Sequence, residues 1–143
     1  MSADVFYEID RALSEGLITG NFQKYTERMH LPLQVIRVGA PDLNLSTMEE
    51  LEADFRLYHD VMRLHAVTDI FREITAQKVH ENGDITVACI THIMSRANRV
   101  LDPFGTEFDL TQVNEKWLVR TIRGTIRHTD WAPGKAGLHN PNT

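Results

Sequence analysis

The sequence predicts an α+β domain in which three N-terminal helices pack on a strongly curved, mostly antiparallel sheet that forms a conical cavity. Apolar residues recur every three or four positions up to about residue 66 and every second position after it, which marks a change from helix to strand spacing. An Asn-Gly pair at 82–83 separates two alternating runs, as in a β-hairpin. The 143 residues suffice for one hydrophobic core. We therefore expect a single domain over residues 1–128, followed by an irregular extension over 129–143.

Two helices are expected in the first third of the chain. The first covers residues 2–15, where the apolar side chains share one helical face, and Gly16 is expected to end it. The second begins after Gly20, with Asn21 as its N-cap. Pro32 is expected to close this helix, because proline disfavours helix at the residue before it. The apolar residues of the two faces are Val5, Ile9, Ala12 and Leu13, then Phe22, Tyr25 and Met29.

A short strand and a third helix follow the proline. The strand is expected over residues 33–38 and ends at a Gly-Ala-Pro turn. Two overlapping capping boxes precede the helix, Ser46 with Glu49 and Thr47 with Glu50. The apolar face of this helix consists of Leu51, Phe55, Tyr58 and Met62.

Four longer strands are expected after residue 66, and the last three form an antiparallel meander. The segment 85–95 is apolar on both of its faces. One face can pack on the helices, whereas the other needs a cover that a second copy of the chain would supply, so we expect a homodimer. The expected strands are 67–79, 85–97, 104–113 and 116–128.

Composition and motifs limit the classes of function. Fifteen Lys and Arg against twenty Asp and Glu give a net charge of −5, which argues against a nucleic-acid partner. The sequence has no apolar run long enough for a membrane span and no secretion leader, so we expect a cytoplasmic protein without a membrane partner. It has no phosphate-binding loop, dinucleotide fingerprint or paired metal-binding motif, so neither a cofactor nor a metal is expected. The single Cys89 excludes an internal disulfide.

Three features together resemble a known superfamily. They are the Gly20-Asn21 break between two helices, the helix expected over 47–62, and a final hairpin in which the apolar strand 108–113 is followed by a short turn and the strand 117–119. This order resembles the nuclear transport factor 2-like superfamily, a cystatin-like α+β cone that includes ketosteroid isomerases and SnoaL-like polyketide cyclases. The resemblance covers about residues 3–128.

The resemblance implies two kinds of function. One is a SnoaL-like, cofactor-free isomerase, cyclase or dehydratase acting on a small apolar organic molecule. The other is a non-catalytic domain that binds a small ligand or assembles as a dimer. Of the three functional positions of ketosteroid isomerases, the tyrosine position falls near Leu13 and the base position near Arg37, neither of which can do that chemistry. Only Asp109 matches, and this argues against ketosteroid isomerisation.

Asp109 is therefore the candidate catalytic residue. If its side chain faces the cavity, two-residue spacing places Glu107 on the same face, and the same register turns Arg123 and Thr91 inward from neighbouring strands. Arg37 would approach from the first strand. We expect these four residues to bind the substrate, because charged groups inside a protein are rarely unpaired.

Two alternatives remain open at the level of sequence. The same charges could form a structural ion-pair network, or the register could be displaced by one residue, which would move every side chain to the other face of the sheet. Tyr25 and Tyr58 lie on apolar helical faces and are either core residues or hydrogen-bond donors to a substrate, since a buried phenol needs a partner.

Overall fold

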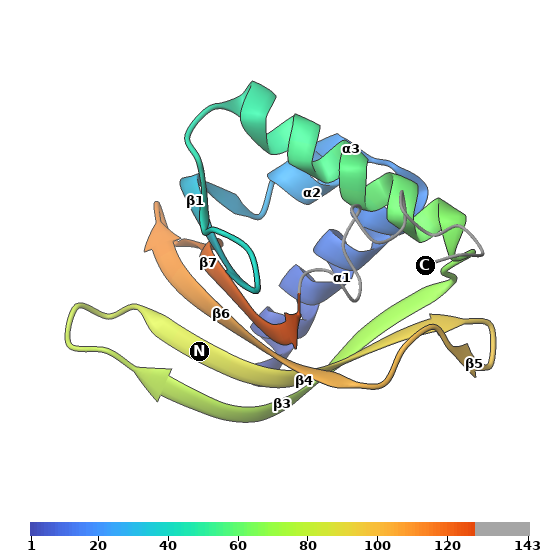
Figure 1. The fold of residues 1–143 in the computed structure, drawn as a ribbon. Coiled ribbons are helices and arrows are strands. Elements are labelled where there is room, and N and C mark those ends of the chain that lie inside the picture. The colour runs from blue at the N-terminus through green and yellow to red at the C-terminus, as the bar shows by residue number, and fades with distance from the viewer. Residues whose placement is uncertain (128–143) are drawn as a thin grey trace.

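The computed structural model describes residues 1–127, with side chains up to residue 124, and has the predicted α+β architecture. Three helices cover the concave face of one strongly curved sheet (Figure 1). The expected extension over 129–143 lies outside the described residues. The helices are α1 (Ala3–Thr19), α2 (Phe22–Thr26) and α3 (Met48–Leu64). The strands are β1 (Met29–Val38), β2 (Leu43–Leu45), β3 (Asp69–Val79), β4 (Ile85–Ser95), β5 (Asn98–Arg99), β6 (Phe104–Val113) and β7 (Lys116–Arg127).

The sheet is mostly antiparallel, as predicted. Its strand order is β2-β1-β7-β6-β4-β3, and β5 pairs with β4. The pairs β4–β6 and β6–β7 form the expected meander, β3 and β4 form the hairpin expected around the Asn-Gly pair, and only β1 and β7 run parallel. Each of the four long strands lies within two residues of its expected bounds. The short strands β2 and β5 were not expected, because two or three residues carry no periodicity.

Helix α1 continues past its expected end, so the prediction that Gly16 stops it is wrong. Gly16 is helical and buried, and a Cβ atom there would lie 2.9 Å from the Cβ of Tyr25, so glycine allows α1 and α2 to pack closely. The helix ends instead at Gly20, which has a left-handed φ of +78° and whose amide donates to the Gly16 carbonyl at 2.9 Å.

Gly20 also contacts α3 closely, which yields a stability prediction. A Cβ on Gly20 would lie 2.7 Å from Nε2 of His59, and that ring is held by a 2.6 Å hydrogen bond between its Nδ1 and the Leu17 carbonyl oxygen. We expect Gly20→Ala to lower the free energy of unfolding by about 1–3 kcal/mol more than Gly39→Ala does. Gly39 has the same left-handed φ, +79°, but open space around the added Cβ, so both variants share the backbone strain. Urea denaturation measures the difference, and equal losses would contradict the steric contact.

Asn21 caps α2 as predicted, accepting from the Lys24 amide at 3.1 Å. However, α2 ends at Thr26 and β1 begins at Met29, so Pro32 lies inside a strand and does not close a helix. Pro32 is tolerated there because β2 pairs with β1 only from Leu33 onward and the β1–β7 register is irregular around it.

The start of α3 confirms one of the two capping boxes. Thr47 is the N-cap: its hydroxyl accepts from the Glu50 amide at 3.1 Å, and the Glu50 carboxylate accepts from the Thr47 amide at 3.1 Å. This fixes the rotation of α3. Leu51, Phe55 and Met62 are buried against the core, and the carboxyl of Asp54 lies on the same side of the helix.

The main core fills the space between the helices and one end of the concave face. It includes Phe6, Leu33, Phe55 and Phe108, each at most 2% exposed. A smaller cluster of Met62, Val67 and Ile93 closes the other end. Between these two clusters the fold leaves a cavity.

Candidate functional site

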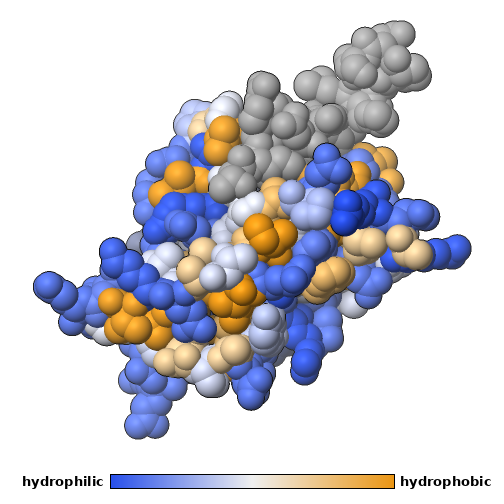
Figure 2. Space-filling model, turned by 90° about the horizontal axis from the view of Figure 1, so that it is seen from below, coloured by the Kyte–Doolittle hydropathy of each residue, from blue (hydrophilic) through white to orange (hydrophobic). Residues whose placement is uncertain are grey.

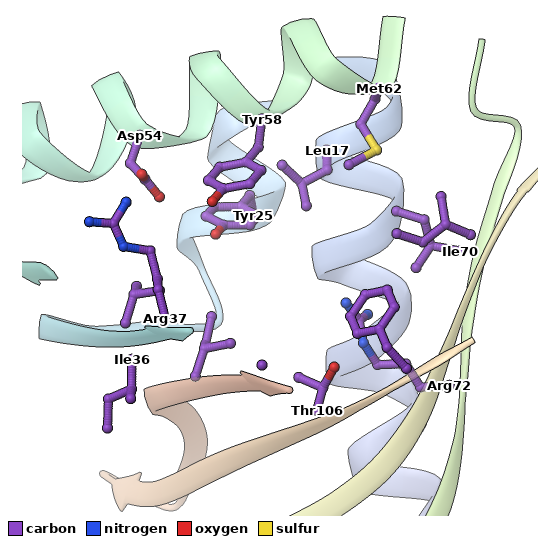
Figure 3. A pocket seen from close by; sticks show the side chains of 15 residues that line it. Leu17, Tyr25, Ile36, Arg37, Asp54, Tyr58, Met62, Ile70, Arg72 and Thr106 are labelled. Atoms are coloured by element: carbon purple, nitrogen blue, oxygen red, sulfur yellow. The ribbon is translucent and has the colours of Figure 1, made fainter. Parts of the chain in front are cut away.

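The cavity lies between α1, α2, α3 and the concave face of the sheet and encloses about 170 Å³ (Figure 3). A pocket at this position is the default candidate for a ligand site when apolar walls surround a few convergent polar groups. Most of its walls are apolar, including Leu17, Met62, Ile70, Ile93, Phe104 and Ile122. The polar groups that line it are Tyr25, Arg37, Asp54, Tyr58, Arg72 and Thr106.

Four of these polar residues form one end of the cavity. Asp54 and Tyr58 are one turn apart on α3, Tyr25 comes from α2 and Arg37 from β1. Figure 3 shows the Asp54 carboxyl directed toward the Arg37 guanidinium, with the two phenol groups beside them. Arg37 is held in place because its Nε donates to the Pro41 carbonyl oxygen at 2.9 Å. This end therefore contains an acid, a fixed cation and two hydroxyl groups.

Burial changes the acidity of these groups. It raises the pKa of Asp54 to about 6 from an ordinary 3.8, although the charge of Arg37 acts in the opposite direction. Burial, followed by the negative charge of Asp54, raises the pKa of Tyr58 to about 12 and that of Tyr25 even further above its ordinary value. Near neutral pH both phenols are therefore protonated donors, and Asp54 can exchange a proton with a bound molecule.

Arg72 and Thr106 form a second polar region. Arg72 on β3 makes a buried ion pair with Asp10 of α1, and its Nη1 also donates to the Ser14 hydroxyl at 3.2 Å. Its guanidinium lies 5.1 Å from the centre of the Phe108 ring. The hydroxyl of Thr106 on β6 shares a 2.9 Å hydrogen bond with the hydroxyl of Thr91 on β4.

The structure brings some of the predicted binding residues to the cavity. Arg37, Tyr25 and Tyr58 line it. Thr91 faces inward as expected and is 1% exposed, but it is hydrogen-bonded to Thr106 and reaches the cavity only through that residue.

The placement of Asp109, Glu107 and Arg123 on the cavity face was wrong. These side chains lie on the outer face of the sheet, because the apolar Phe108 and Leu110, between and beside the two acids on β6, occupy the inner face. On β6 and β7 this is the one-residue displacement left open above, whereas β4 has the expected register. The alternation of β6 carries this signal, because Phe108 and Leu110 are the apolar members of the strand and the acids occupy the alternate positions.

The outer charges form an ion-pair network. Arg123 donates from Nη1 and Nη2 to the Asp109 carboxylate at 2.8–2.9 Å, and its Nε lies 3.5 Å from Glu107. The Thr86 hydroxyl donates to the same carboxylate at 2.7 Å. Both carboxylate oxygens of Asp109 thus accept hydrogen bonds from other residues of the sheet. This geometry fits the alternative in which these charges form a structural ion-pair network.

Sequence reasoning missed Asp54, Arg72 and Asp10, although each interrupts an apolar pattern. Asp54 lies three residues after Leu51 and four before Tyr58, on the apolar side of its helix. Arg72 occupies the inward position between Ile70 and Ile74. A charged residue inside an apolar repeat is the signal that could have identified them.

Cys89 is a buried thiol that belongs to the core. It is 2% exposed, its Sγ contacts the Thr106 carbonyl oxygen at 3.4 Å, and burial raises its pKa to about 11. Because the thiolate is the reactive form, this cysteine is unsuited to nucleophilic chemistry.

Two further features can be stated for residues 1–127. No group of three or more His, Cys, Asp or Glu side chains within this range could hold a metal ion. Within the same range, no helix combines the length and apolarity needed to cross a membrane.

Comparison with known proteins shows a shared fold at low sequence identity. A protein of unknown function from Shewanella oneidensis, described as nuclear transport factor 2-like, is 12% identical with a TM-score of 0.66, covering 87% of this chain and 98% of that one. A candidate dehydratase of that family from Streptomyces avermitilis is 16% identical with a TM-score of 0.58, covering 85% and 92%. A candidate ketosteroid isomerase from Shewanella frigidimarina is 12% identical with a TM-score of 0.61, covering 82% and 92%. No protein-family model and no curated protein matches the chain.

Proposed function

Because the chain has the nuclear transport factor 2-like fold, we propose that it is a cofactor-free enzyme that moves a proton on a small, mainly apolar organic molecule, as an isomerase, cyclase or dehydratase. The observation that carries the proposal is the Asp54 carboxyl, which faces a largely apolar cavity beside two phenol groups and the guanidinium of Arg37. Two of the proteins that share the fold are described as a candidate dehydratase and a candidate ketosteroid isomerase, which supports this class of chemistry.

Asp54 would act as the base. A pKa of about 6 leaves most of its carboxyl groups ionised at neutral pH and makes the carboxylate a stronger base than an exposed one. After taking a proton from one carbon or oxygen of the substrate, it can return the proton to another. Tyr58 and Tyr25 remain protonated and would donate hydrogen bonds to a polar group of the substrate that lies beside Asp54.

The cavity limits the size of the substrate. Its volume of about 170 Å³ is close to the ~150 Å³ of an engineered apolar cavity that binds benzene. A molecule with one ring and a short substituent therefore fits, whereas a fused four-ring compound needs far more space. We propose a one-ring substrate on this basis.

Proton transfer at Asp54 can be tested by hydrogen–deuterium exchange. One-ring ketones are incubated with the protein in D₂O, and loss of the signal of the α protons is followed by NMR. We expect wild type to accelerate exchange above the buffer rate and Asp54→Asn, which keeps the shape but not the base, to lose about 10²–10⁴-fold of that acceleration. Asp109→Asn removes a carboxylate outside the cavity and is expected to exchange like wild type. Equal exchange by wild type and Asp54→Asn would contradict the proposal.

A non-catalytic ligand-binding domain is the second candidate. The observation that favours it is that the cavity has a preformed polar end and apolar walls, which is sufficient for binding alone. Under this alternative the one-ring ketones perturb the NMR signals of the cavity residues, but no variant changes the exchange rate.

We also propose that the chain forms a homodimer through the outer face of the sheet. Figure 2, which views the molecule from the sheet side, shows apolar side chains grouped within a polar surround. Phe71 of β3 is 46% exposed and stacks on His92 at 4.5 Å, and the partly buried Ile90 and Met94 of β4 lie on the same face. Contiguous apolar surface on a sheet typically marks an interface.

The dimer yields a mass prediction. Light scattering at micromolar concentration is expected to give twice the 16.4 kDa of the chain, and Ile90→Lys to reduce it to one chain, because the lysine places a charge inside the proposed apolar interface. Leu57→Lys places the same charge at a 52% exposed apolar residue on α3 and should leave the mass unchanged. A wild-type protein with the mass of one chain would contradict the proposed dimer.

A further inference from the structure

Arg72 occupies a different side of the cavity from Asp54 (Figure 3). Its guanidinium is fixed from two directions. Asp10 and Ser14 of α1 hold Nη1, and the Ser14 hydroxyl donates in turn to the Asp10 carboxylate at 3.2 Å. The ring of Phe108 supports the flat face of the group. A guanidinium held in this way cannot rotate to find new partners, so the directions of its remaining N–H groups are set by the fold.

One of these remaining donors is unused. Nε of Arg72 is buried, and it has no hydrogen-bond partner among the described residues. Buried N–H groups are nearly always paired. Because Arg72 is one of the residues that line the cavity, a bound molecule is a partner that could complete this donor. The unpaired donor therefore indicates that the cavity binds a molecule with a hydrogen-bond acceptor.

Thr106 adds a hydroxyl group on the same wall of the cavity. Thr106 and Thr91 share one hydrogen bond, in which either hydroxyl can donate. When Thr91 donates, the hydroxyl hydrogen of Thr106 is available to a molecule in the cavity, which Thr106 lines. This region thus offers donors from two side chains that line the same cavity.

The charge of the region decides which acceptor it suits. The positive charge of Arg72 is already balanced by Asp10, whose side chain is 8% exposed. A carboxylate in the cavity would add a third buried negative charge to Asp10 and Asp54, which already face the two cations Arg72 and Arg37, and this is unfavourable. A neutral oxygen can accept the hydrogen bonds without that cost.

We propose that Arg72, with Thr106, is the polar anchor of the cavity and binds a neutral acceptor oxygen, such as a carbonyl group, of the one-ring molecule. This inference rests on the proposed function only in taking the cavity as a ligand site. It names the substrate class as a neutral carbonyl compound, in preference to a carboxylate or a hydrocarbon. Arg72 orients the molecule, and Asp54 meets a different part of it.

Three one-ring probes of similar size test the acceptor. Acetophenone has a neutral carbonyl, ethylbenzene has no acceptor, and benzoate has an anionic one. Each is titrated into ¹⁵N-labelled protein, and both the backbone signals of the cavity residues and the Nε–H signal of Arg72 are followed. We expect acetophenone to bind at least tenfold more tightly than the other two and to shift the Nε–H signal, which ethylbenzene leaves in place.

Two variants separate binding by Arg72 from its structural role. Arg72→Lys keeps a cation opposite Asp10 but has no Nε–H. The double variant Asp10→Leu with Arg72→Met removes the ion pair as a unit and leaves no unpaired charge. In both we expect acetophenone to bind about tenfold more weakly, which corresponds to about 1.4 kcal/mol, and ethylbenzene to bind as in wild type.

The outcomes distinguish this inference from the proposed enzymatic function. Equal affinity for acetophenone and ethylbenzene, tighter binding of benzoate, or unchanged acetophenone affinity in both variants would overturn the role of Arg72, even if exchange still depends on Asp54. Loss of acetophenone affinity in both variants supports the inference, even if no exchange occurs. Absence of binding by every probe would overturn it together with the ligand site.

Discussion

Replacing Arg72 by Met is expected to lower the free energy of unfolding by about 3–5 kcal/mol, the largest effect of any polar substitution considered for this chain. The side chains of Arg72 and Asp10 are 13% and 8% exposed, so the substitution leaves a carboxylate inside the protein without its counter-ion. Ser14, the other described partner of Asp10, is a neutral hydroxyl and cannot replace the lost charge. Urea denaturation followed by circular dichroism measures the loss.

Two controls identify the cause. Adding Asp10→Leu to Arg72→Met removes the unpaired charge and should recover most of the stability, because a buried ion pair replaced by apolar groups is often neutral or stabilising. Arg63→Met breaks the ion pair with Asp60 on α3, where the two side chains are 72% and 69% exposed, and is expected to lose at most about 1 kcal/mol. If the double variant is as unstable as the single one, lost packing and not the unpaired charge explains the effect.

Asp54 is expected to make the fold less stable as the pH rises. Its pKa of about 6 in the folded protein lies above the ordinary 3.8 that applies to the unfolded chain, so the folded state binds more protons between these values. The free energy of unfolding therefore falls by up to about 3 kcal/mol as the pH rises from about 4 through about 6, and the loss is complete above that pH. The charged carboxyl group that the proposed chemistry needs is thus destabilising.

The Asp54→Asn variant reveals this contribution. Other groups also titrate, so the quantity to follow is the stability of the variant minus that of wild type, which is expected to increase with pH across this window. Asp60→Asn removes an acid of the same helix whose side chain is 69% exposed and should parallel wild type. A constant difference between Asp54→Asn and wild type from pH ~4 to ~7 would show that Asp54 is not desolvated.

Several elements of the fold could be predicted because their signals are local. The capping box at Thr47 and Glu50, the Asn-Gly turn and the two-residue spacing of the long strands depend on residues only a few positions apart. The errors at Gly16 and Pro32 have a different origin. Gly16 stays helical because it contacts Tyr25 of another helix, and Pro32 fits a strand because the pairing of neighbouring strands is interrupted around it.

The sequence by itself determined the order of the three helices and the five longer strands, the faces of α3 and β4 that meet the core, and the presence of two tyrosines on the inward side of the helices. Only the tertiary structure decided which charges share a space. The pairing of Arg72 with Asp10 joins residues 62 positions apart, and the approach of Arg37 to Asp54 depends on how β1 passes beneath α3. Period-two alternation allows either face of a strand to be the inner one, so the position of Asp109 was settled by the burial of Phe108 and Leu110 beside it. Local spacing fixes which side chains share a face, whereas the meeting of two faces depends on the packing of the whole chain.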